Sequence, residues 1–106
     1  MKIITAQISV KAEHWEEAQE LAESHSRVSR DEPGCLSHDW FPHPREAHTI
    51  FFFEQWRDQA AIDEHFARPY SAVLVASFQR WAESPLELRI LDVDHVEARS
   101  IPGPVR

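Results

Sequence analysis

Cysteine is scarce in this sequence, since Cys35 is the only one among 106 residues. A single cysteine cannot form a disulfide within one chain, and this usage is typical of proteins in a reducing compartment. Long apolar runs are also missing, because no stretch approaches the roughly 20 residues that a membrane-spanning helix requires. The chain passes from Lys2 directly into a strand-like pattern, which is not the pattern of a signal peptide. These absences predict a cytoplasmic protein with no membrane partner.

Positive charge is also in short supply. The chain has 11 Lys and Arg residues against 18 Asp and Glu residues, which gives a formal net charge of -7. Binding to the phosphate backbone of nucleic acids depends on clustered Lys and Arg, and the sequence contains no such cluster. Nucleic acid is therefore not an expected partner.

What is present is typical of one folded domain. Hydrophobic residues make up 42% and charged residues 27% of the chain, as in ordinary globular proteins. A chain of this length leaves little room for a second core. We expect one domain over residues 1–95 and a tail over residues 96–106, which contains Pro102, Gly103 and Pro104.

The first half of the chain predicts a strand followed by a helix. β-branched residues are frequent over residues 2–10, and every second residue there is apolar, which predicts a strand. From about Glu13 the spacing changes to three and four residues, which predicts an amphipathic helix. Its stripe consists of Trp15, Ala18, Ala22, His25 and Val28. The helix should stop near Asp31, because Pro33 disfavours helical geometry before it and Gly34 can supply a left-handed turn.

The second half predicts a hairpin, a broken helix and a last strand. Residues 35–41 and 48–55 alternate as strands around a polar, proline-containing turn at 43–46, so we expect an antiparallel hairpin. Asp58 can cap a helix that Pro69 interrupts, and a further helix follows over residues 71–82. Residues 86–95 read as the last strand. This β-α-β-β-α-β order predicts an α+β, ferredoxin-like split βαβ fold, a four-stranded antiparallel sheet with helices on one face.

The strand patterns bear on oligomeric state. In the third strand Ile50 and Phe52 face one side of the sheet and Phe51 and Phe53 the other, and the last strand is also apolar on both sides. Helices on one face leave the second face uncovered, and monomers rarely expose a large apolar patch. We therefore expect a homodimer in which two sheets face one another.

Three segments of the sequence resemble a known family when they are taken together. They are EPGCL at residues 32–36, EQWRD at 54–58, and AIDEH at 61–65 leading to Pro69 and Tyr70. In this order they resemble the antibiotic biosynthesis monooxygenase family, small dimeric α+β-barrel proteins that include quinol and anthrone monooxygenases. The resemblance covers residues 1–95. It implies cofactor-independent oxidation of an aromatic quinol-, anthrone- or polyketide-like substrate by O2, in a pocket between sheet and helices.

Such a reaction requires a base, donors that hold a developing oxyanion, and apolar walls. By the resemblance, His65 and Trp56 match the family's histidine and tryptophan, as base and N–H donor, while each has packing as its alternative role. His38, on a strand parity that can face the pocket, is the third catalytic candidate, and Glu54 is expected to be structural. The expected substrate-binding residues are Gln7, Phe51, Phe53, Tyr70 and Phe78.

No metal or organic cofactor is expected. Gln7 replaces the asparagine that haem-degrading relatives use, and Leu74 or Val75 takes the place of their haem-ligating histidine. His38, His43 and His48 are spaced five residues apart across a hairpin, which is not a compact metal-binding pattern.

Two other functions also fit the sequence. Some relatives isomerise small phosphorylated metabolites, for which Arg57, Arg68 and Arg80 are the candidate cationic residues. A non-catalytic ligand-binding or stress-response dimer is the third hypothesis. The fold alone does not choose among the three.

Overall fold

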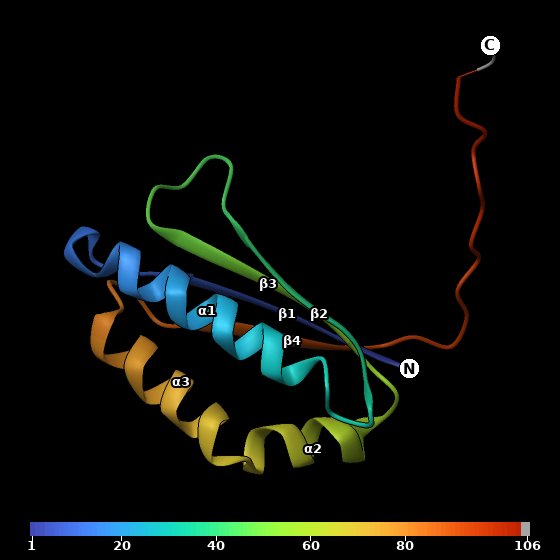
Figure 1. The fold of residues 1–106 in the computed structure, drawn as a ribbon, viewed down its shortest axis with the longest axis horizontal. Helices are drawn as coiled ribbons and strands as arrows, with labels where there is room; N and C mark the ends of the chain where they lie inside the picture. The colour runs from blue at the N-terminus through green and yellow to red at the C-terminus, as the bar shows by residue number, and fades with distance from the viewer. Residues whose placement is uncertain (105–106) are drawn as a thin grey trace.

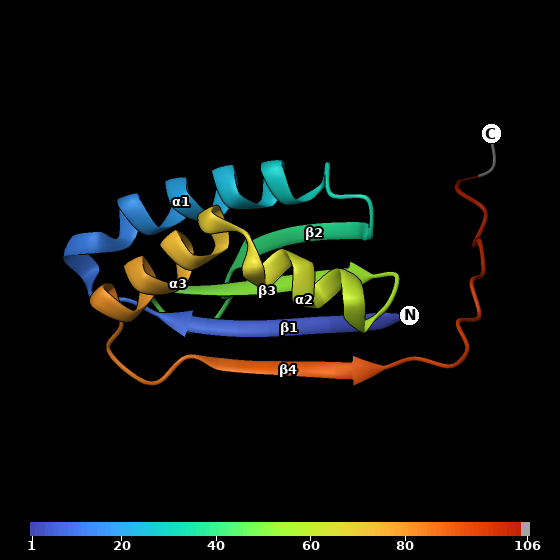
Figure 2. The ribbon, with the colours of Figure 1, turned by 90° about the horizontal axis from the view of Figure 1, so that it is seen from below.

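A computed structural model describes residues 1–104 of the protein (Figure 1). The elements are β1 (Lys2–Ser9), a 3-10 helix η1 (Ala12–His14), α1 (Trp15–Ser29), β2 (Cys35–Pro42), β3 (Thr49–Trp56), α2 (Gln59–Ala67), α3 (Pro69–Trp81) and β4 (Glu87–Asp92). The strands form one antiparallel sheet in the order β2-β3-β1-β4. All three α-helices lie on the same side of that sheet (Figure 2). The predicted α+β ferredoxin-like fold is confirmed.

Capping and proline chemistry set the boundaries of α2 and α3. Asp58 accepts a hydrogen bond from the backbone nitrogen of Ala61 at 2.9 Å, so it caps α2 as expected. Arg68 has extended backbone angles, φ -72° and ψ 141°, because the following Pro69 disfavours the helical region for it. Pro69 itself begins α3, two residues earlier than predicted, since its fixed φ suits the first helical turn.

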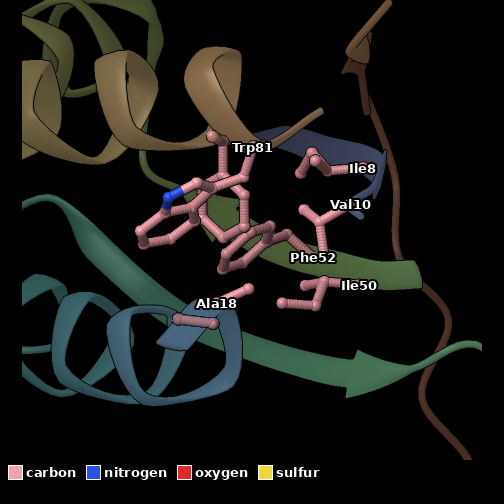
Figure 3. Packing of buried hydrophobic residues seen from close by; sticks show 8 residues of the cluster. Ile8, Val10, Ala18, Ile50, Phe52 and Trp81 are labelled. Carbon is pink, nitrogen blue, oxygen red and sulfur yellow. The ribbon is translucent and has the colours of Figure 1, made fainter. Parts of the chain in front are cut away.

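Apolar side chains fill the layer between the sheet and the helices. One cluster consists of Ile8, Val10, Ala18, Ala22, Ile50, Phe52, Phe78 and Trp81 (Figure 3). A second cluster lies toward α2 and consists of Ile4, Trp56, Ala61 and Ile62. Cross-strand partners share a face, and Ile8 lies opposite Ile50 in the β1–β3 ladder. The alternation predicted for β1 and β3 therefore places one parity of each strand against the helices.

The other parity faces the side of the sheet that the helices do not cover, which we call the open face. Gln7 lies opposite Phe51, and Thr5 lies opposite Phe53, on this face. Phe41, the β2 partner of Phe51, is 52% exposed. In the edge strand β4, every residue is exposed. The apolar residues of the open face are those from which a dimer was inferred, and the homodimer itself stays a prediction.

The end of the chain runs away from the folded body. Val93 donates a backbone hydrogen bond to the carbonyl oxygen of Met1 at 3.0 Å, and residues 94–104 then continue without helix or strand (Figure 1). The division into a domain of residues 1–95 and a tail of residues 96–106 stays a prediction. Among the described helices, none combines the length and apolar character needed to cross a bilayer.

Gly34 has a different role from the left-handed turn predicted for it, because no described glycine has a positive φ. A Cβ atom at Gly34 would overlap the Cβ of Ala61 and lie 3.5 Å from its Cα. The backbone nitrogen of Arg57 also donates to the carbonyl oxygen of Gly34 at 2.9 Å. Glycine is therefore required here by the close approach of the loop before β2 to the first turn of α2.

Replacement of Gly34 by alanine tests this close approach. We expect Gly34→Ala to lower the free energy of unfolding by about 1–3 kcal/mol, because the added methyl group forces α2 outward. Ala61→Gly alone should cost about 0.5–1 kcal/mol of helix propensity. The double variant has no such overlap. In urea denaturation, its loss of unfolding free energy should therefore be smaller than the sum of the two single losses by about 1 kcal/mol or more.

Gly103→Ala is the matched control, because no atom of the described part of the chain lies within 4 Å of a Cβ at that position. Its unfolding free energy should stay within about 0.5 kcal/mol of the parent. Strict additivity of the Gly34 and Ala61 substitutions would contradict the packing explanation.

Candidate functional site

Three histidines from three elements meet between the helices and the sheet. His25 of α1 lies 5.1 Å from His38 of β2 and 5.1 Å from His65 of α2, measured between ring centroids, and His38 lies 5.5 Å from His65. The exposed fractions of the three residues are 6%, 0% and 1%. One ring nitrogen from each lies within 4.8 Å of the others. We call this set the histidine group.

Local patterns bring each histidine to this place. His25 follows Ala18 and Ala22 on the buried stripe of α1, as predicted. The last turn of α1 departs from the predicted stripe, because Val28 is 50% exposed while Ser26 and Ser29 are buried. The cause is a polar contact, because the Ser26 hydroxyl lies 2.9 Å from Nδ1 of His38. The end of α1 therefore presents hydroxyl groups to the sheet.

The carboxylate of Glu32 joins the histidine group to α3. Nδ1 of His65 lies 2.8 Å from its Oε2, and the Tyr70 hydroxyl donates to the same oxygen. Arg68 Nε lies 3.0 Å from Oε1. Burial opposes ionisation of Glu32, but the hydrogen bonds from Tyr70 and His65 and the charge of Arg68 outweigh it and lower its pKa. An ionised carboxylate only accepts, so the Nδ1–H of His65 is the donor.

Glu54 and Trp56 form the sheet side of the site. The indole N–H of Trp56 donates to Glu54 Oε1 at 3.0 Å, and the same oxygen lies 3.3 Å from Nε2 of His38. Trp56 is completely buried, and its ring centroid lies 4.6 Å from that of His65. The hydrogen-bond donor that the sequence offered to a substrate is thus used within the protein. Glu54 is structural in its contacts, as expected.

Burial decides the ionisation of His25. Removal from water, followed by the neighbouring rings of His38 and His65, lowers the pKa of His25 to about 3. Its ring is therefore neutral near pH 7, and its buried Nδ1 has no hydrogen-bond partner among the residues that the structure describes. His25 lies on the buried stripe predicted for α1, but it is not among the predicted site residues. The sequence did contain a sign of its position, because the buried stripe of the helix and the strand face that carries His38 both point into the layer between sheet and helices.

The structure divides the predicted site residues between two faces of the sheet. His65, Trp56, His38 and Tyr70 come together beside the helices. Phe78 lies one ring further away, in the hydrophobic cluster, 6.3 Å from Phe52. A single pocket between sheet and helices cannot include the remaining predicted residues, because Gln7, Phe51 and Phe53 face the opposite side.

The open face has a hollow of its own. It measures about 210 Å³ and is lined by Thr5, Ala6, Gln7, Phe51, Glu87 and Arg89. The Gln7 side chain donates to Glu46 at 3.0 Å at this face. On the helix side, by contrast, the two hydrophobic clusters and the histidine group occupy the space where the substrate pocket was expected.

Two histidines considered with His38 lie elsewhere. The ring nitrogen Nδ1 of His43 accepts hydrogen bonds from the backbone nitrogens of Arg45 and Glu46 in the hairpin loop. His48 stacks edge-on against Trp15 at the start of α1, 5.8 Å between centroids. Neither belongs to the histidine group.

Comparison with known proteins identifies one family. Residues 1–77 match the model of a family described as antibiotic biosynthesis monooxygenase. An uncharacterized protein of Synechocystis sp. is 33% identical over 91 residues, which are 86% of this chain and 62% of that protein. The chain therefore spans less than two thirds of that relative.

Two further relatives match over most of their length. YcnE of Bacillus subtilis, provisionally named a monooxygenase, is 32% identical over 88 residues, which are 83% of this chain and 93% of that protein. A crystal structure described as an antibiotic biosynthesis monooxygenase superposes with a TM-score of 0.82 at 27% identity, over 88% of this chain and 98% of the other.

Substitution of Trp56 by phenylalanine tests whether its N–H is structural. We expect Trp56→Phe to lower the free energy of unfolding, because the buried carboxylate of Glu54 loses a donor, and hydrogen bonds to charged groups contribute about 1.5–3 kcal/mol. Trp40→Phe is the control, since Trp40 is partly buried on the same face and packs against the core. Urea denaturation should show a loss for Trp56→Phe that exceeds the control by about 1.5 kcal/mol or more. Equal losses would show that this hydrogen bond contributes nothing.

Proposed function

The chain belongs to the antibiotic biosynthesis monooxygenase family, and we propose that it oxidises an electron-rich aromatic hydroxy compound of the quinol, anthrone or polyketide type. The oxidant is O2, and no cofactor takes part in the reaction. The observation that carries the proposal is the pairing of His65 with Glu32 at 2.8 Å.

That pairing equips His65 as a general base. The ionised carboxylate of Glu32 holds the proton on Nδ1 and stabilises the imidazolium that forms when Nε2 takes up a proton. The described residues give Nε2 no hydrogen-bond partner. Glu32 itself does not meet the substrate, so in this proposal it positions His65.

The chemistry follows from the spin state of oxygen. A neutral phenol or anthrone reacts slowly with triplet O2, whereas its anion can transfer one electron to O2 and then combine with the superoxide formed. For an anthrone-like substrate, a CH2 group becomes a carbonyl group, one atom of O2 enters the product, and the other leaves as water with the two hydrogens. The substrate supplies all four electrons, and the protein supplies the base.

The packed interior restricts where a substrate can approach. The partly exposed neighbours of His65 are Phe66, Tyr70 and Arg68, at the junction of α2 and α3. We place substrate entry at this junction, where Arg68 interrupts the helix with extended backbone. Phe66, 38% exposed, offers an aromatic surface at the rim.

The competing functions are affected differently by the structure. A non-catalytic dimer, in which the residues between sheet and helices are simply packed, is favoured by one observation, the filling of that layer by side chains. An isomerase of a phosphorylated metabolite would need free cationic groups. Arg57 already lies 3.3 Å from a carboxylate oxygen of Asp58 and Arg68 lies 3.0 Å from one of Glu32, so a phosphate would have to displace these partners.

Oxygen consumption tests the proposed reaction. Tag-free, chelator-treated protein is incubated with a panel of dihydroxynaphthalenes and anthrones, and O2 uptake is followed with an electrode. We expect uptake above the spontaneous rate for at least one substrate. His65→Gln should lower kcat by about 100-fold or more, the usual contribution of a general base.

The matched control is His95→Gln, an exposed histidine in the tail, which should leave turnover unchanged. Full turnover of a folded His65→Gln variant would remove His65 from the mechanism. Absence of uptake with every substrate would favour the non-catalytic binding function.

The homodimer is part of the same proposal. The open face carries Phe41, Phe51 and Phe53 on neighbouring strands, and its exposed apolar surface is the kind that a partner covers. A second copy of the chain, seated sheet to sheet, would bury these rings and close the hollow at Gln7.

Light scattering after gel filtration tests the dimer. The parent should have twice the chain mass of 12.3 kDa. Phe53→Glu should give monomers, because the interface would bury an unpaired charge. Phe66→Glu, which places the same charge on the exposed side of α2, should remain dimeric. A dimer that survives Phe53→Glu would place the interface elsewhere.

A further inference from the structure

The histidine group has a feature that base catalysis does not use: three buried imidazoles converge from α1, β2 and α2. We propose that His25, His38 and His65 form a binding site for a divalent transition-metal ion such as Zn²⁺. This inference goes beyond the proposed function, in which no metal takes part.

Buried nitrogens without partners support the site. Among residues 1–104, four buried side-chain atoms have no hydrogen-bond partner, and two of them are His25 Nδ1 and His38 Nε2. His38 Nε2 has Glu54 Oε1 at 3.3 Å but in a direction that makes no hydrogen bond. Unsatisfied buried polar groups are costly in a native structure. A metal ion would accept the lone pairs that these nitrogens offer, and imidazole nitrogen is a preferred ligand of Zn²⁺.

The second nitrogen of two of the rings already has the kind of partner that metal-binding histidines have. His65 donates through Nδ1 to the Glu32 carboxylate, and His38 Nδ1 lies 2.9 Å from the Ser26 hydroxyl. Such outer partners fix the ring orientation and leave Nε2 for the metal. The third ring, His25, is held by packing between His38, His65 and Tyr70.

Charge around the site favours a cation. The residues Glu32 and Glu54 are 8% and 6% exposed, and the carboxylate of each lies beside a histidine of the group. Glu32 has Arg68 as a counter-charge, whereas the described residues offer Glu54 only His38. A bound dication would place a positive charge close to the Glu54 carboxylate, whose Oε1 lies 3.3 Å from Nε2 of His38.

The ring nitrogens of the histidine group lie somewhat further apart than the ligands of a bound metal ion. A tetrahedral Zn²⁺ with Zn–N distances of about 2.0–2.1 Å has ligand nitrogens about 3.3–3.4 Å apart. The nitrogens of the group lie within 4.8 Å of one another, so the widest pair must approach by about 1.4 Å. Rotation of the side chains about χ1 and χ2 would supply this movement when the ion binds. Three protein ligands leave the fourth position for water.

Metal and substrate would then compete for one lone pair. Nε2 of His65 cannot both bind a metal ion and take a proton from a substrate. The metal-bound state is therefore an inactive state of the proposed oxygenase, and the chelator-treated state is the active one.

Binding of the metal alone, without substrate, tests the site. Tag-free, chelator-treated protein is titrated with Zn²⁺ by calorimetry and with Co²⁺ by absorption spectroscopy. We expect one equivalent per chain, the d–d absorption of tetrahedral Co²⁺, and a rise in Tm with Zn²⁺. In the NMR spectrum of the parent, Zn²⁺ should shift the ring signals of three of the 7 histidines and leave the rest in place.

Variants locate the ion. Ser26→Ala, which keeps the packing but removes the outer partner of His38, should weaken binding roughly 10–100-fold. His25→Gln should weaken it further, and circular dichroism checks that both variants are folded. The double variant His43→Gln/His95→Gln, which removes two histidines outside the group, should bind as the parent does.

Two results would overturn the proposal: no binding by the parent at saturating metal, or binding that the His43→Gln/His95→Gln variant loses while Ser26→Ala and His25→Gln retain it. Neither result depends on turnover. Zn²⁺ binding without O2 consumption would support the metal site and contradict the proposed function. O2 consumption without Zn²⁺ binding would support the proposed function and contradict the metal site.

Discussion

One buried carboxylate fixes the arrangement of the helices. Glu32 lies in the loop after α1, yet its oxygens are approached by His65 of α2, Tyr70 of α3 and Arg68 between them. Loss of these partners would leave an uncompensated buried charge, which costs several kcal/mol. Satisfying Glu32 therefore holds the α2–α3 junction against the loop before β2. Gly34 permits this approach, because any side chain there would meet Ala61.

This constraint explains why polar groups gather inside a hydrophobic layer. Because His65 pairs with the buried Glu32, it is buried as well. His38 of β2 then lies beside His65 on the helix side of the sheet. The hydroxyls of Ser26 and Ser29 complete the end of α1, where the apolar stripe would otherwise continue. The result is a polar cluster next to the rings of Phe52, Trp56 and Tyr70, in which the carboxylates of Glu32 and Glu54 lie beside the three imidazoles. Both proposals draw on this single feature.

Sequence patterns predicted the elements well because their signals are local. The Asp58 cap and the alternation of β1 and β3 each depend on a few neighbouring residues, and the structure confirms them. The placement of functional side chains depended on contacts across the fold. The sequence allows Trp56 either to donate its N–H to a substrate or to serve in packing, and in the structure the Glu54 carboxylate two residues away accepts this N–H. Gln7 and Phe51 are expected to bind substrate between sheet and helices, but their strand parity places them on the open face.

The sequence by itself determined the order of the elements, the class of fold and the two-sided apolar character of β3, because backbone propensity and the alternation of side chains do not depend on distant residues. Only the tertiary structure decided which side chains meet. His25, His38 and His65 are separated by more than ten residues in the chain, and no spacing rule relates them. They converge because α1 and α2 pack on the side of the sheet that His38 of β2 faces (Figure 2), and burial there lowers the pKa of His25 to about 3. Among residues 1–104, Nδ1 of His25 has no hydrogen-bond partner.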